Sequence, residues 1–181
     1  MKMHLGDLEI CSSAFKPLDH IPKRYSRYGD NISPPLKWMN APGETKEFTL
    51  ICYDPDAPVT FGFTHWLLYG IPPKITSIEE GEGKTFTEGL NSGGKLGYSG
   101  PAPPPGHGPH HYYFWVYALD KALELKPGLK RQELLDAIDE HIIVQARYVG
   151  IMNWNNLKIL QSQIIIKFFI SFFNILYNLI F

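Results

Sequence analysis

Residues 111–119, with the sequence HYYFWVYAL, are the stretch of this chain that decides its fold. Aromatic and β-branched residues favour extended backbone, and no glycine or proline interrupts the run. On a strand, alternate residues from Phe114 to Ala118 face one side and those from Tyr113 to Tyr117 face the other. Both sets are apolar, so we expect a central strand that is covered on both sides.

Two shorter strands are predicted upstream of this one. Residues 48–53 (FTLICY) form an apolar run that ends at Asp54-Pro55, and residues 65–71 (HWLLYGI) form a second run that Pro72 closes. Residues 91–109 are rich in glycine and proline, which excludes regular structure and predicts a long surface loop.

A single helix is predicted over residues 129–150, after the break at Pro127-Gly128. Apolar side chains recur there at the spacing of one helix face, and Gly150 is placed to end the helix. That face comprises Leu134, Leu135, Ile138, Ile142, Gln145 and Val149. The chain as a whole therefore predicts a mainly β fold, a β-rich α+β class.

The totals restrict the classes of function. A chain of 181 residues with 44% apolar residues can bury one ordinary core. Its 17 basic and 18 acidic residues leave a net charge of −1, so nucleic acid is not an expected partner. Cys11 and Cys52 are the only cysteines, and the N-terminus lacks an apolar signal segment. We therefore expect a cytoplasmic protein with no disulfide scaffold, and no cofactor is predicted.

The composition changes near residue 154, and we expect a domain over residues 1–154 followed by an apolar tail over 155–181. Residues 164–181 are almost long enough to span a bilayer. Their polar side chains instead fit one stripe of an amphipathic helix, which suits a partner helix or a headgroup layer. A frameshift or a lost stop codon would also give such a run, because its residues are largely those of A/T-rich codons. All three interpretations stay open, and a membrane partner is expected only if the tail is a selected segment.

Three polar stretches lie at junctions between loops and strands, where they can share a pocket. Residues 54–58 (DPDAP) follow one predicted strand, residues 65–66 (HW) open the next, and residues 100–112 (GPAPPPGHGPHHY) lead into the aromatic strand. Imidazoles change charge near neutral pH, and a neighbouring carboxylate favours their protonated form, which suits an oxyanion. Backbone N–H groups of residues 106–108 can add donors, and the prolines stiffen the loop.

These motifs, taken in order, resemble the phosphatidylethanolamine-binding protein family in its Raf-kinase-inhibitor-like bacterial branch. DPDAP, HW and GPxPPxGxGxHxY running into FxxYAL match it, as does GDNISPPLKW at residues 29–38, so the resemblance covers roughly residues 4–150. It implies a compact fold of antiparallel sheets with a few peripheral helices. It also implies a cavity for phosphate, a phosphorylethanolamine headgroup or a similar anion, and a regulator or inhibitor role toward a kinase or protease partner.

By matching motif positions, the resemblance implies a set of ligand-binding residues. The two histidines would donate to the anion, Asp54 would orient and charge them, the tyrosine would donate from the wall, and the prolines would shape the rim. The set is Asp54, Pro58, His65, Pro104, His110 and Tyr112. The chain departs from the family at His111, where arginine is frequent, and in its ending after Gly150.

Other interpretations of the same residues stay open. Asp54 alone would fit a turn after a strand, and His65 alone would fit a satisfied core histidine. A metal site of His65, His107, His110 and His111 is not favoured, because adjacent residues on a strand face opposite ways.

The alternative function is a small phosphoester hydrolase that uses Asp54, His65 and His110 as acid–base groups. No activated nucleophile and no lysine or arginine placed to grip a phosphate can be read from the sequence. Cys52 lies inside an apolar strand and does not fit an exposed nucleophile. We therefore predict a binding protein rather than an enzyme, with no metal.

Overall fold

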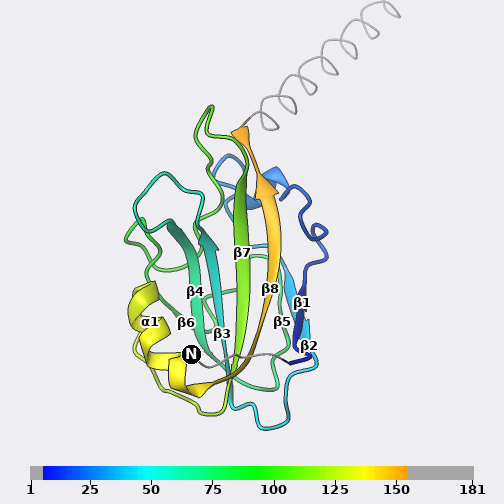
Figure 1. Cartoon of the computed structure of the whole chain (residues 1–181), viewed down its shortest axis with the longest axis vertical. Coiled ribbons are helices and arrows are strands. Elements are labelled where there is room, and N and C mark those ends of the chain that lie inside the picture. Colours follow the sequence, from blue (N-terminus) through cyan, green and yellow to red (C-terminus); the bar gives the residue numbers. More distant parts are fainter. Residues whose placement is uncertain (1–5, 155–181) are drawn as a thin grey trace, which may run out of the picture.

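The structure, a computed structural model, describes residues 6–154, which form two antiparallel β-sheets and one short α-helix (Figure 1). The smaller sheet has the order β1 (Glu9–Cys11), β2 (Leu36–Met39) and β5 (Ser77–Ile78). The larger has the order β6 (Thr87–Glu88), β4 (Phe63–Ile71), β3 (Glu47–Asp54), β7 (His110–Leu119) and β8 (Ile142–Met152). The helix α1 spans Arg131–Ile138, and 3-10 turns lie at Lys23–Tyr25 (η1) and Asp139–His141 (η2).

Strand β7 is an interior strand of the larger sheet, as its sequence predicts. It pairs with β3 on one side and with β8 on the other, and β8 follows it from His110 to Leu119. One face of β7 is fully buried around Phe114, whereas Tyr113 and Trp115 on the other face are half-buried. The strands predicted at residues 48–53 and 65–71 are confirmed as β3 and β4.

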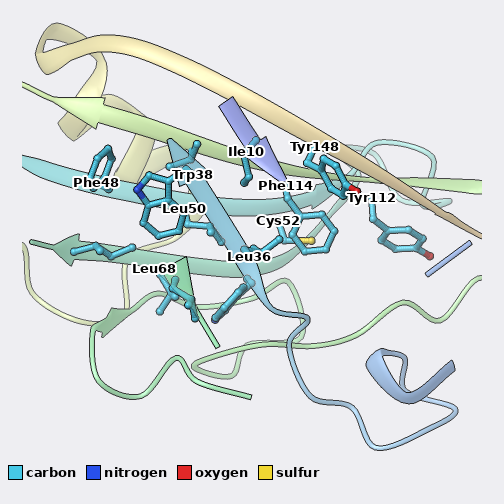
Figure 2. Close-up of a cluster of buried hydrophobic side chains, with 14 of the residues drawn as sticks. Ile10, Leu36, Trp38, Phe48, Leu50, Cys52, Leu68, Tyr112, Phe114 and Tyr148 are labelled. Atoms are coloured by element: carbon cyan, nitrogen blue, oxygen red, sulfur yellow. The ribbon is translucent and has the colours of Figure 1, made fainter. Parts of the chain in front are cut away.

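Different elements cover the two faces of the larger sheet. Figure 2 shows Ile10 and Trp38 of the smaller sheet packed against one face, where Phe114 is also buried. On the other face, Leu134 and Ile138 of α1 are buried in a second cluster. The β-rich α+β class predicted from the sequence is confirmed.

The helix predicted over residues 129–150 is wrong for its second half. The α-helix ends at Ile138, and after the turn η2 the chain continues as strand β8. Alternate residues of β8, from Ile142 to Met152, are buried, apart from half-buried Ala146. The apolar residues there thus fit a period of two as well as a helical period, and pairing along the whole of β7 favours the strand.

Gly150 is a strand residue rather than the end of a helix. It pairs with Tyr112 of β7, and a Cβ atom at this position would come within 2.5 Å of Cγ1 of Ile21. Glycine is therefore required here by close packing, since β8 runs directly under the N-terminal loop.

The loop, the cysteines and the C-terminal segment were also subjects of prediction. Residues 91–109 contain no strand or helix, as predicted, and Cys11 and Cys52 are both free. Within residues 6–154, no helix has the length and apolar character needed to cross a bilayer. The three interpretations of the apolar tail concern residues 155–181, which lie outside the described part of the chain.

Candidate functional site

Three strand ends meet at one end of the larger sheet, the upper end in Figure 1. Strand β3 finishes at Asp54, which pairs with Phe63 at the beginning of β4, and β7 begins at His110 next to β3. Antiparallel pairing places the last residues of one strand against the first residues of both neighbours. Polar stretches that are far apart in the sequence therefore lie together in space.

A cavity of about 250 Å³ lies at this end of the sheet. Its wall contains all six residues of the predicted ligand set: Asp54, Pro58, His65, Pro104, His110 and Tyr112. Their role in binding stays a prediction, but the fold brings them to one place. Loop residues complete the wall, among them Arg27 and Ser99.

Asp54 and His110 form a buried pair in this wall. Nδ1 of His110 donates to Oδ2 of Asp54 at 2.7 Å, and Oδ1 accepts the backbone N–H of Asp56 at 2.8 Å. Burial raises the pKa of the Asp54 carboxyl, and the hydrogen bond and charge of His110 partly offset that rise. Nε2 of His110 lies 2.9 Å from Nδ1 of the exposed His107, so both nitrogens of His110 have partners within the protein.

His65 has a different environment. Its Nδ1 contacts the backbone carbonyl of Ser99, an oxygen that only accepts, so Nδ1 carries the proton. Nε2 is buried, has no hydrogen-bond partner among residues 6–154, and lies 4.0 Å from Oδ2 of Asp54. Burial lowers the pKa of His65 to about 4. The charges of His110 and Arg27 also lower this pKa, whereas the hydrogen bond to Ser99 raises it.

The unpartnered ring nitrogen of His65, Nε2, is therefore a hydrogen-bond acceptor at neutral pH. The family resemblance implies that His65 is a hydrogen-bond donor whose protonated form Asp54 favours. Two features of the fold oppose that role. The ring is desolvated, which disfavours the imidazolium, and 4.0 Å is too long for a hydrogen bond from Nε2 to the Asp54 carboxylate.

Tyr112 and Arg27 supply donors to the same cavity. The buried Tyr112 hydroxyl has no hydrogen-bond partner within the described residues. Its burial, with Asp54 and other groups nearby, raises the pKa of the phenol, so it keeps its proton. Arg27 is exposed at the cavity and takes part in none of the ion pairs found in residues 6–154.

No arginine of this site was identified from the sequence, and Arg27 is the residue that was missed. It precedes all three polar motifs and carries no motif signal of its own. A tertiary contact brings it to the cavity, because its backbone N–H donates to the carbonyl of Pro101 at 3.1 Å.

His111 points away from His110, as expected for neighbours on a strand. Its backbone N–H and its Nδ1 lie 2.8 and 2.7 Å from Oδ2 of Asp56. Burial alone would raise the pKa of Asp56, but the hydrogen bonds and charge of His111 lower it overall. Within the part of the chain described, no group of three or more His, Cys, Asp or Glu residues is arranged to hold a metal ion.

A larger groove of about 510 Å³ lies between the turn at Phe61 and the start of α1 at Arg131. Its buried amide, Asn91, is satisfied, since Nδ2 donates to the carbonyl of Gly97 at 3.0 Å and Oδ1 accepts a backbone N–H. None of the unpartnered buried side-chain atoms found in residues 6–154 belongs to this groove, whereas two belong to the smaller cavity. The smaller cavity is thus the candidate site.

Fold and cavity together define a class: a small antiparallel β-sheet protein with a His/Asp/Tyr cavity at one end of its larger sheet. A model of the phosphatidylethanolamine-binding protein family matches residues 11–153. The chain belongs to this family.

Similar proteins agree with this assignment along most of their length. The UPF0098 protein of Methanothermobacter thermautotrophicus is 42% identical over 150 residues, which cover 80% of this chain and 97% of that protein. The crystal structure of a family homologue from Chlamydia trachomatis has 38% identity and a TM-score of 0.76, with 81% and 97% of the two chains covered. Escherichia coli YbcL, described as a member of the mammalian family, has 26% identity and a TM-score of 0.77, with 82% and 99% covered. These structures confirm the predicted antiparallel fold.

Proposed function

We propose that the cavity binds a phosphate-type oxyanion, either inorganic phosphate or a phosphorylated headgroup such as phosphorylethanolamine. One observation carries this proposal: the Tyr112 hydroxyl and Nε2 of His65 are buried and unpartnered among the described residues, and both residues line the same cavity. Buried polar groups normally have partners, and leaving one unpaired costs about 1–3 kcal/mol. A ligand that bonds to both atoms would remove this cost.

The charges around the cavity support an anion in spite of the buried Asp54. Its carboxylate already accepts hydrogen bonds from His110 and from the backbone of Asp56, which reduces its repulsion of a ligand. Arg27 provides a positive charge at the cavity, and guanidinium donors suit phosphate oxygens. The family's name agrees with a phosphorylated headgroup as ligand.

Binding rather than catalysis is the function that these residues favour. Cys52 is fully buried in β3, and burial raises the pKa of its thiol, which opposes its use as a nucleophile. Both nitrogens of His110 are occupied within the protein, and the free Nε2 of His65 is a weak base because burial lowers the pKa of this ring to about 4. Regulation of a kinase or a protease stays a prediction of the family resemblance.

The test is calorimetric titration of the full chain with inorganic phosphate and with phosphorylethanolamine, alongside Arg27→Ala and Lys23→Ala. Lys23 lies four residues upstream and outside the cavity wall, so it controls for the loss of one positive charge. We expect saturable binding that Arg27→Ala weakens about fivefold, because a charged contact at an exposed site contributes up to about 1 kcal/mol. Lys23→Ala should leave the affinity unchanged.

A folded protein that gives no saturable heat with either ligand would contradict the proposal. Equal weakening by the two variants would remove Arg27 from the site, because long-range charge would then explain its effect.

A further inference from the structure

We infer that the cavity accepts an oxyanion only when the ligand carries a proton on one of its own oxygens, so that it binds phosphate and rejects sulfate. The inference rests on the proposed function and specifies its ligand as a protonated oxyanion: hydrogen phosphate or a singly protonated phosphomonoester. It follows from the balance of donors and acceptors in the cavity wall.

The first acceptor is Nε2 of His65. Its ring cannot exchange tautomers freely, because moving the proton to Nε2 would leave the Nδ1 lone pair facing the lone pairs of the Ser99 carbonyl. The charged groups that face this ring are Asp54 of β3, His110 of β7 and Arg27 of the N-terminal loop. Two of these three repel a second proton on His65, and the ring is also desolvated, so Nε2 stays unprotonated at neutral pH.

The second acceptor is Oδ2 of Asp54, which receives one hydrogen bond from His110 and has a lone pair left. The 4.0 Å between this oxygen and Nε2 of His65 is too long for direct bonding. A ligand hydroxyl near this gap can donate its proton to either acceptor. An unprotonated ligand oxygen at the same place would face the lone pairs of Nε2 and of Oδ2, and it would have no proton to donate to either.

The donors of the cavity, the Tyr112 hydroxyl and the Arg27 guanidinium, can then bond to the remaining ligand oxygens. Hydrogen phosphate matches this mixed set, because it has one O–H donor and three acceptor oxygens. Sulfate has a similar size and shape, but it carries no proton at neutral pH. Sites built to bond a ligand hydroxyl reject analogues that lack it by orders of magnitude.

The experiment is calorimetric titration of the full chain at neutral pH with sodium phosphate and, at matched ionic strength, with sodium sulfate. We expect saturable phosphate binding and sulfate binding that is at least about 100-fold weaker. Equal affinities would overturn this inference and leave the proposed function standing. No binding of either ion would overturn both.

Two variants test whether His65 is the residue that discriminates phosphate from sulfate. His65→Phe keeps a ring in the buried position but removes the acceptor, so the ratio of phosphate to sulfate affinity should fall about tenfold. His141→Phe, at a histidine that pairs with Asp120 away from the cavity, should keep the ratio. An unchanged ratio in a folded His65→Phe protein would overturn the role of Nε2, and the wild-type ratio decides the inference if that variant does not fold.

Discussion

Two histidines flank the same carboxylate in this cavity, and the atoms that they face give them different properties. Nδ1 of His110 meets a carboxylate oxygen of Asp54, whereas Nδ1 of His65 meets the carbonyl of Ser99. Nε2 of His110 is occupied by His107, whereas Nε2 of His65 has no partner within the described residues. Only His65 therefore offers a free ring nitrogen to a ligand.

The buried neutral ring of His65 makes the stability of the protein depend on pH. Its pKa is about 4 in the folded protein, against an ordinary value of 6.5 for an exposed histidine, so the unfolded chain binds the extra proton between these two pH values. The contribution of His65 to the free energy of unfolding should therefore be fully present above pH 6.5 and fall by roughly 3 kcal/mol as the pH drops to 4. Urea denaturation at several pH values measures this loss.

The matched comparison is His65→Phe, which should be less stable at pH 7 but should lose about 3 kcal/mol less than wild type on acidification. His141→Phe, half-buried beside Asp120, should keep the wild-type loss. Parallel pH profiles for wild type and His65→Phe would show that His65 is not the buried neutral group.

At the scale of elements, β8 is the strand that was predicted as a helix. The pattern from Ile142 onward fits a helix face and a strand face equally well, and only the partner strand decides between them. Strand β7 was predictable because its aromatic and β-branched composition favours extended backbone and no glycine or proline interrupts it. The segment from Ile142 onward is amphipathic and directly follows a helix, so its composition does not decide its conformation, which depends on tertiary pairing.

Gly150 gives a direct test of β8. A Cβ there would meet Ile21 Cγ1 at 2.5 Å and Phe15 Cε2 at 2.6 Å, and both side chains are buried. Gly150→Ala should lower the free energy of unfolding by about 1–3 kcal/mol through overpacking. Chemical denaturation measures the change.

Gly43→Ala is the control, because a Cβ at the exposed Gly43 meets no atom within 4 Å. It should change the stability by less than about 0.5 kcal/mol. If both variants unfold at the wild-type midpoint, then β8 does not pack under the N-terminal loop as described.

At the scale of the whole molecule, the sheet topology assembles the site from segments that are distant in the sequence. The three polar motifs were predictable because each lies where a strand begins or ends, and antiparallel order joins those ends. Arg27 and the Ser99 carbonyl were not predictable, because they reach the cavity through loop contacts, to Pro101 and to His65. The tautomer of His65, and with it the preference for a protonated ligand, depends on one of these contacts.

Tyr112→Phe tests most directly whether this cavity binds phosphate through the atoms that lack a partner within residues 6–154. The change removes only the buried hydroxyl, and Tyr117→Phe removes a hydroxyl from the opposite face of β7. In calorimetric titrations with phosphate, Tyr112→Phe should bind at least about tenfold more weakly than wild type, the worth of one hydrogen bond to a charged group, while Tyr117→Phe should match it. Equal phosphate affinity in all three folded proteins, or no phosphate binding by wild type, would contradict the claim.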